Sequence, residues 1–322
     1  MSKEILAKKI YQTIVEAQNI LVATHYAPDG DAAAALSAMA QILQRLGKKY
    51  TLFCADRFDD KLAWLPWLGQ TVNREQDLPW AEFDLFITLD CGTLARSRLS
   101  GPIKARQTYQ KLIEIDHHQP MEQVADWALR QPAAASTTEV IYDWLRINHL
   151  PISQPLAEAI LVGLVVDTGN FIYSATSEKN LAIAAEMLQR GANWPKIIKT
   201  AAGSADLGTA KLWGLALERL KINHRYQVAF TVLTRADLEN CHTDDEATEG
   251  LAGFLSRLKD VKAVLVLKET GDGVIKGSWR ACQTGVNVAK LCSFLGGGGH
   301  VKAAGFHFNG RLVKDGAGWK VV

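Results

Sequence analysis

The sequence predicts an α/β protein of two domains, the larger one built on a mostly parallel sheet that carries helices on both faces. Two observations predict this class. The length of 322 residues is typical of two domains, and short apolar runs alternate with helix-length segments over the first part of the chain. We expect a smaller α/β domain to follow, with a cleft between the two.

The larger domain, predicted at residues 1–197, begins with a helix and then alternates strands with helices. Apolar residues at helical spacing predict a helix over 3–17, and the Ala- and Leu-rich segment 31–46, which stops at Gly47, predicts the next. Apolar runs too short for helices predict strands at 19–24, 50–54, 83–89 and 111–115. Further helices are predicted at 137–148, 154–166 and 178–190, and the apolar 154–166 helix is expected to be buried.

A linker is predicted at 198–209 and the smaller domain at 210–322. The segments Asn193-Trp194-Pro195 and Ala202-Gly203-Ser204 interrupt the helical pattern, which resumes at 207–220. Within the smaller domain we expect strands at 227–233, 263–268 and 274–280, helices at about 246–258 and 286–294, and an edge strand at 319–322.

Composition excludes several classes of protein. The 36 basic and 34 acidic residues leave a net charge of only +2, which argues against a broad basic surface for duplex DNA. The chain has no apolar run long enough to span a membrane and no signal-peptide pattern at its start, so no membrane partner is expected. The 5 cysteines include no C-x-x-C pair. We therefore expect reduced thiols in a cytoplasmic protein.

Acidic and histidine side chains follow several of the predicted elements. In open α/β sheets, ligands bind at the carboxyl ends of the strands. One such residue has a simple explanation, since Asp31 could merely cap a helix, but the repetition favours a metal site. Oxygen and imidazole ligands without thiolate suit Mn²⁺, Mg²⁺ or Co²⁺, and two such ions can promote an in-line displacement at phosphorus. The residues are His25, Asp29, Asp31, Asp90, Asp116, His117, His118 and Asp167.

The smaller domain carries a separate basic pattern. Lys276, Ser278 and Arg280 alternate along a predicted strand and therefore share one face. The alternative is a solvated edge strand with no ligand. The glycines 296–299 precede a predicted short helix that starts near His300, an arrangement that favours an anion-binding nest.

Taken in order, four motifs resemble the DHH phosphoesterase family with its C-terminal DHHA1 domain. They are His25-Tyr26-Ala27-Pro28-Asp29-Gly30-Asp31, Asp116-His117-His118, Asp167-Thr168-Gly169, and Gly296-Gly297-Gly298-Gly299-His300-Val301-Lys302-Ala303-Ala304-Gly305. The resemblance covers essentially the whole chain. Within this RecJ-like family, the length and the glycine motif most resemble the branch of nanoRNases and pAp phosphatases.

The resemblance implies a role for each matching residue. It implies one ion held by His25, Asp29 and Asp90, and a second ion held by Asp31, Asp90, His117 and Asp167. The implied catalytic residues are the bridging Asp90, His118 facing the scissile phosphate, and Asp116 orienting an imidazole. The implied substrate-binding residues are Lys276, Ser278, Arg280, Gly297, Gly298, Gly299 and His300.

The expected function is therefore a hydrolase that uses two Mn²⁺ ions, with Mg²⁺ or Co²⁺ as alternatives. Its expected substrates are very short single-stranded oligonucleotides, cut to mononucleotides, and 3′-phosphoadenosine 5′-phosphate, converted to AMP. Two alternatives stay open: a phosphodiesterase for cyclic or linear dinucleotides, and a nucleotide-binding module without catalysis. Because family members often form dimers, a homodimer also stays open.

Overall fold

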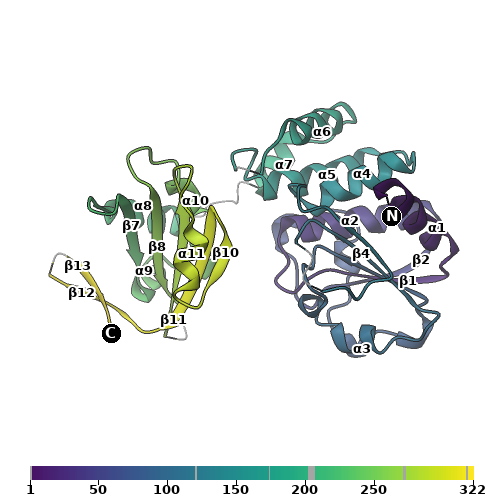
Figure 1. Cartoon of the computed structure of the whole chain (residues 1–322), viewed down its shortest axis with the longest axis horizontal. Helices are drawn as coiled ribbons and strands as arrows, with labels where there is room; N and C mark the ends of the chain where they lie inside the picture. The colour runs from purple at the N-terminus through teal and green to yellow at the C-terminus, as the bar shows by residue number, and fades with distance from the viewer. Residues whose placement is uncertain (1, 120–121, 174, 202–206, 271–272, 317) are drawn as a thin grey trace. The chain divides into compact units, whose positions relative to one another are not determined.

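The structure is a computed structural model, and it describes residues 2–119, 122–173, 175–201, 207–270, 273–316 and 318–322. The chain divides into two compact units, Met1–Ser204 and Ala205–Val322, each with its own sheet (Figure 1). The predicted linker at 198–209 crosses this division, and its residues 202–206 lie outside the described part of the chain. No helix among the described residues is both long enough and apolar enough to cross a bilayer.

The first unit contains a five-stranded parallel sheet in the order β2-β1-β3-β4-β5. This confirms the predicted α/β class. The order reverses beside β1, which pairs with both β2 and β3, and such a reversal is where doubly wound sheets bind ligands. The strands are β1 (Asn19–Ala23), β2 (Lys49–Phe53), β3 (Leu85–Leu89), β4 (Lys111–Asp116) and the unpredicted β5 (Trp127–Arg130).

Alternate residues of these buried strands pack into two different clusters. Ile20 and Val22 of β1 face the main helical core, whereas Leu21 and Ala23 face a smaller cluster on the other side of the sheet. The smaller cluster is covered by short elements that include η4 (Trp80–Glu82), η5 (Leu94–Ser97) and α3 (Ser100–Lys104), through Trp80, Leu94 and Ile103. Leu62 of η1 (Asp60–Leu62) and Leu68 of η2 (Leu68–Gln70) pack instead in the main helical core. The remaining short helix of this region is η3 (Glu75–Asp77). Apolar side chains on both faces explain why the strands read as continuous apolar runs.

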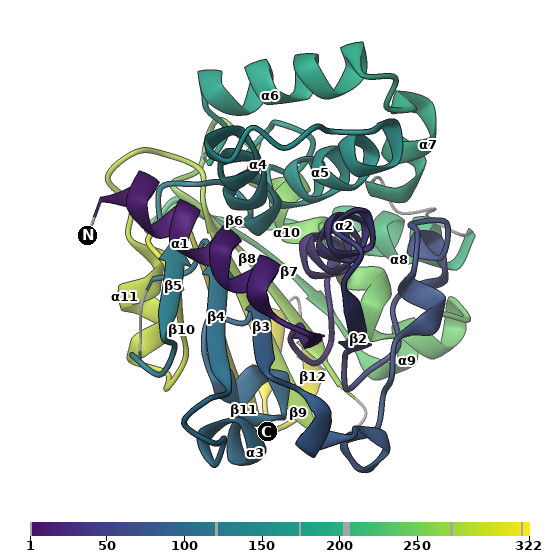
Figure 2. The same ribbon diagram turned by 90° about the vertical axis from the view of Figure 1, so that its right-hand side faces the viewer.

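Long helices form the other side of the unit. The buried α5 lies between α2 and α6, as Figures 1 and 2 both show. The predicted interruption at Trp194-Pro195 is wrong, because these residues begin a helix, where proline is tolerated in the first turn. The helices are α1 (Lys3–Glu16), α2 (Gly30–Arg45), α4 (Thr137–Ile147), α5 (Gln154–Asp167), α6 (Glu178–Gln189) and α7 (Trp194–Ala201).

The second unit contains a six-stranded mixed sheet in the order β10-β11-β9-β8-β7-β6, and a separate two-stranded sheet of β12 and β13. Because β9 pairs on both sides, the edge-strand alternative for Lys276, Ser278 and Arg280 is wrong. The strands are β6 (Lys221–Asn223), β7 (Val228–Leu233), β8 (Ala263–Glu269), β9 (Val274–Ala281), β10 (Gly298–His300), β11 (Ala303–Asn309), β12 (Leu312–Asp315) and β13 (Gly318–Val321).

Two predicted helices of this unit differ in the structure. The segment 246–258 is divided because Gly250, at φ 79°, separates the short η6 (Asp245–Thr248) from α10 (Leu251–Leu255). No helix begins at His300. That residue ends β10, which pairs antiparallel with β11 and so satisfies part of the backbone of the glycine segment. The other helices are α8 (Leu207–Glu218), α9 (Arg235–Asn240) and α11 (Val288–Ser293).

Candidate metal centre

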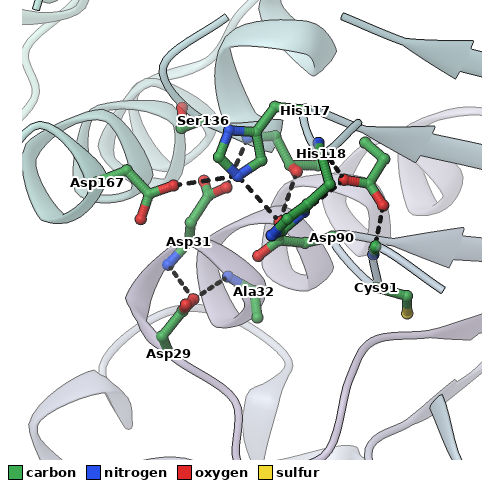
Figure 3. Close-up of polar contacts among 12 residues, drawn as sticks. Asp29, Asp31, Ala32, Asp90, Cys91, His117, His118, Ser136 and Asp167 are labelled. Atoms are coloured by element: carbon green, nitrogen blue, oxygen red, sulfur yellow. Dashed lines mark hydrogen bonds and ion pairs between the residues drawn. The ribbon is translucent and has the colours of Figure 1, made fainter. Parts of the chain in front are cut away.

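Four chain segments bring acids and histidines together at the carboxyl end of the parallel sheet (Figure 3). His25 follows β1, Asp90 follows β3, and Asp116 ends β4. Asp90 has a left-handed backbone, at φ 58°, a conformation that Asp adopts more readily than most residues. Asp29 rather than Asp31 caps α2, because its carboxylate accepts the N–H groups of Asp31 and Ala32 at 3.1 and 3.0 Å. The cap explanation for Asp31 is therefore wrong.

Three groups of these side chains have the spacing of metal ligands. In each group, one nitrogen or oxygen per residue lies within 4.8 Å of the others. Asp90 belongs to two of the groups, and so does His117. The groups are His25 with Asp29 and Asp90, Asp31 with His117 and Asp167, and Asp90 with His117 and His118.

His25 tests whether the residues fit a cation. Its Nδ1 lies 2.7 Å from the Tyr26 carbonyl oxygen, so Nδ1 carries a proton, and in the neutral ring that binds a cation Nε2 has a lone pair. This Nε2 is buried and forms no hydrogen bond with any described residue. It lies 3.7 Å from Asp90 Oδ2 and 4.0 Å from Asp29 Oδ2. A buried lone pair beside two carboxylates lacks a donor, and a divalent cation supplies that missing partner.

His117 and His118 point different atoms into the site. His117 Nε2 lies 3.4 Å from Asp90 Oδ1 and 3.5 Å from Asp167 Oδ2. His118 Nδ1 instead lies 2.8 Å from Asp116 Oδ1, closer than its 3.5 Å distance to Asp90. Because Nδ1–H donates its hydrogen bond to Asp116, Nε2 is the His118 atom that remains available to a reacting group.

Asp116 is built to hold the His118 ring. Its Oδ1 also accepts the His118 backbone N–H at 2.8 Å, and its Oδ2 accepts the Gly92 N–H at 2.7 Å. Arg130 lies 3.5 Å from the same Oδ2. Burial alone would raise the pKa of Asp116, but the hydrogen bonds from His118 outweigh burial and lower it. The carboxylate therefore stays ionised and fixes the ring orientation.

The remaining acids repel one another. Burial, together with the charge of Asp90, raises the pKa of Asp31 to about 7, and burial and the Asp31 charge raise that of Asp167. Burial opposes the ionised form of His117, yet the hydrogen bond to Asp90 and the charge of Asp31 raise its pKa to about 10. Such a concentration of buried negative charge requires positive charge, and divalent cations provide it.

The predicted substrate residues belong to the second unit, where the strand register places several of them on one face. Arg280 lies opposite Ala303, which lies opposite His300, so the two basic side chains share a row of the sheet. Lys276 lies in another row, between Lys268 and His307. The sequence did not predict that Lys268 and His307 lie beside Lys276, because their proximity depends on a register that one sequence does not reveal.

Sequence reasoning also missed the polar start of α4. Thr137 Oγ1 donates to Asp90 Oδ1 at 2.9 Å, and Thr138 Oγ1 donates to Asp31 Oδ1 at 2.9 Å. Ser136, Thr137 and Thr138 have the composition of an ordinary helix N-terminus, and the sequence offers no signal that the hydroxyl groups of Thr137 and Thr138 reach the candidate ligands Asp90 and Asp31.

Comparison with known proteins defines the class. The model of the DHH family, N-terminal domain, matches residues 19–164, and that of the DHHA1 domain matches residues 226–315. The chain belongs to the DHH family of phosphoesterases and carries the DHHA1 domain, as its motifs predicted.

Individual relatives extend over nearly the whole chain. A probable bifunctional oligoribonuclease and PAP phosphatase NrnA from Streptococcus mutans is 27% identical over 305 residues, which are 94% of this chain and 92% of the relative. The cyclic-di-AMP phosphodiesterase GdpP of Geobacillus thermodenitrificans is 27% identical over 323 residues, covering 93% of this chain but 46% of that longer protein. The crystal structure of an exopolyphosphatase-related protein from Bacteroides fragilis superposes with a TM-score of 0.87 at 25% identity, covering 98% of this chain and 93% of the other.

Proposed function

We propose that this protein is a cation-dependent phosphoesterase that cuts very short oligonucleotides to mononucleotides and converts 3′-phosphoadenosine 5′-phosphate to AMP. The observation that carries the proposal is the buried Nε2 of His25, which faces two carboxylates and has no hydrogen-bond donor among the described residues. The substrates are supported by the NrnA relative, whose name states both activities. A cytoplasmic location is part of the proposal, since all 5 cysteines are free thiols.

We assign two cation positions to the site. His25, Asp29 and Asp90 would hold the first, and Asp31, Asp90, His117 and Asp167 would hold the second. Mn²⁺ suits this mixture of carboxylates and imidazoles, with Mg²⁺ or Co²⁺ as alternatives. Bound cations supply Lewis acidity and lower the pKa of water to near neutrality.

The chain's own residues supply orientation and a proton. Hydrolysis forms a bond from the water oxygen to phosphorus as the water releases one proton to solvent, and it breaks the bond from phosphorus to the leaving oxygen, which takes up one proton. Asp116 orients His118 so that Nε2–H faces the phosphate and donates that proton. The low pKa of Asp116 keeps its carboxylate ionised, so that it remains an acceptor for the Nδ1–H of His118.

The second unit would bind the end of the substrate that does not react. Arg280 and Lys276 provide positive charge for a phosphate, Ser278 provides a hydroxyl, and His300 shares the row of Arg280. The backbone of Gly298 and Gly299 would contribute without a helix, whereas the predicted Gly297 donates its N–H to the Cys292 carbonyl oxygen at 2.9 Å. Because β10 is an edge strand, the N–H groups on its outer side remain available to an anion.

A second candidate function is hydrolysis of a cyclic dinucleotide. The match to GdpP favours it, because 93% of this chain aligns with 46% of a relative whose name states a cyclic-di-AMP phosphodiesterase activity. Both functions use the same metal centre and differ in the nucleotide that the second unit accepts.

Product chromatography separates these functions. The purified full chain would be incubated with RNAs of two to eight nucleotides, 3′-phosphoadenosine 5′-phosphate and cyclic di-AMP, each with Mn²⁺ or with a chelator. We expect mononucleotides and AMP with Mn²⁺ and no hydrolysis with chelator. Exclusive cleavage of cyclic di-AMP would support the second candidate, and nucleotide binding without any cleavage would indicate a non-catalytic module.

A pair of variants tests the metal centre directly. Asp90→Asn is expected to lower the hydrolysis rate at least about 100-fold, since the residue belongs to both proposed cation positions. Asp126→Asn is the matched control: Asp126 accepts the N–H of Leu112, near the opposite end of β4 from Asp116. Equal activity of the two variants would refute the assignment.

A further inference from the structure

Asp31 is held by the N-terminus of α4 on both of its carboxylate oxygens. Oδ2 accepts the backbone N–H of Thr137 at 2.6 Å, and Oδ1 accepts the backbone N–H and the Oγ1–H of Thr138 at 3.2 and 2.9 Å. The residue has no exposed surface. Thr138 Oγ1 lies 2.9 Å from Ser136 Oγ, which donates to it, because the proton of Thr138 is committed to Asp31.

Gly163, in the middle of α5, leaves the room for this contact. A Cβ atom at this position would lie 2.2 Å from Asp31 Oδ1, 2.2 Å from Thr138 Oγ1 and 2.6 Å from Thr138 Cγ2. These distances are far below van der Waals contact. The Asp31 carboxylate cannot withdraw without giving up its bonds to α4, so an alanine here would separate Asp31 from Thr138 or push α5 away from α2.

The hydrogen bonds also limit what Asp31 can offer to a cation. Each carboxylate oxygen has two lone pairs. On Oδ1 both lone pairs accept hydrogen bonds from Thr138, whereas on Oδ2 one lone pair accepts the Thr137 N–H and the other remains. Asp31 is thereby restricted to one coordinating oxygen, and the position of that oxygen is fixed by α4 and α5 together.

We propose that Gly163 and Thr138 are positioning residues that fix Asp31 as a single-oxygen ligand and so control the cation position it forms with His117 and Asp167. The inference rests on the proposed function, which places a cation there. The position formed by His25, Asp29 and Asp90 does not include Asp31 and is expected to be independent of the two residues.

Calorimetric titration of the cation-free full chain with MnCl₂, together with electron paramagnetic resonance of bound Mn²⁺, tests the proposal without an activity assay. The unchanged protein is expected to bind two ions whose spins couple. Gly163→Ala and Thr138→Val should each weaken one binding step about 10- to 100-fold, abolish the coupling at low Mn²⁺, and leave the other step within about threefold. Thr138→Ser keeps the hydroxyl group and should bind both Mn²⁺ ions with the affinities of the unchanged protein.

Gly214→Ala is the matched control, because Gly214 also lies inside a helix, α8, and a Cβ there would have no atom within 4 Å. It should leave both steps unchanged. The proposal is overturned if Gly163→Ala and Thr138→Val bind both Mn²⁺ ions with unaltered affinity, or if both binding steps are weakened equally. It is also overturned if the unchanged protein binds only one ion. No Mn²⁺ binding by the unchanged protein would refute the proposed function itself.

If Gly163→Ala fails to fold, Thr138→Val alone decides the question, because valine keeps the shape of threonine and removes only the hydroxyl group. A weakened step in Thr138→Val that Thr138→Ser does not restore would also overturn the proposal, since the hydroxyl would then not be the cause.

Discussion

Replacing Asp116 with asparagine tests how the His118 ring is held. The carboxylate accepts two N–H groups of His118 on Oδ1 and the Gly92 N–H on Oδ2. An amide accepts on one side only. If its oxygen faces His118, its NH₂ meets the Gly92 N–H, and if it is flipped, its NH₂ meets the two donors of His118. In either orientation at least one buried donor loses its acceptor.

The size of the effect follows from these contacts. Losing a charged acceptor and leaving a buried N–H unpaired should lower the free energy of unfolding by about 2–4 kcal/mol. Because the pKa of Asp116 is lowered in the fold, its contribution is present above the unfolded value near pH 4 and is lost as the pH falls through the folded value. The difference between variant and parent should therefore disappear in acid. Loss of ring orientation should reduce kcat about 10²- to 10⁴-fold, with KM little changed.

Urea unfolding between pH 3 and 8 and steady-state hydrolysis of a dinucleotide RNA with Mn²⁺ measure the two effects. Asp126→Asn should lose stability, because Asp126 accepts hydrogen bonds from Leu112 and Arg106, but should keep full kcat. If Asp116→Asn keeps kcat while losing stability, the carboxylate has only a structural role and the assignment of His118 is refuted.

Three further predictions concern protons, glycines and substrate. Cation binding at pH 7 should release more than one proton per chain, measurable by calorimetry in buffers of different ionisation enthalpy, because the raised pKa values of Asp31, about 7, and His117, about 10, leave both groups protonated to a large extent. In the cation-free protein, the raised pKa values of Asp31 and His117 stabilise the fold at low pH, and this stabilisation is lost as the pH rises from about 4 to 10. Tm should therefore fall over this pH range, and a rising Tm would contradict the predicted direction of the pKa shifts. Gly297→Ala should lower Tm of the second unit by several degrees, about 1–3 kcal/mol, because its Cβ would lie 2.1 Å from the Gly305 carbonyl oxygen, whereas Gly298→Ala meets no atom within 4 Å and should not. Arg280→Ala should raise KM for dinucleotide RNA about tenfold and leave the Mn²⁺ isotherm unchanged; an altered isotherm would show that the arginine acts on the metal centre.

Much of the first unit could be predicted because its strands are buried on both faces and so read as apolar runs. The strand β5 was not predicted because it lacks this burial: Trp127–Arg130 is short and only Leu129 in it is buried. In the second unit, β10 was not predicted because Gly298 and Gly299 have no side chains that could alternate. Pairing with β11 makes that segment a strand, and no local sequence pattern indicates this pairing.

The candidate ligands could be selected from the sequence because each follows a predicted element, and parallel strands all end at one edge. The residues that hold those ligands in place could not be selected from the sequence. Gly163 lies in a nearly continuous apolar helix, where a glycine indicates close packing without revealing its partner. Asp31 and Thr138 are more than a hundred residues apart in sequence, so their bond depends on how α2, α4 and α5 pack.

The parallel sheet has a consequence for how the metal centre comes into being during folding. Parallel strands are joined by crossovers rather than hairpins, so contacts between them close slowly and depend on distant segments. The candidate ligands extend from His25 to Asp167, and a nascent chain that ends before α5 lacks one of them. A cation that binds only the completed site would stabilise the native state by about 2.7 kcal/mol at a hundred times its Kd. Metal availability in the cell would then influence the amount of folded protein as well as its rate of hydrolysis.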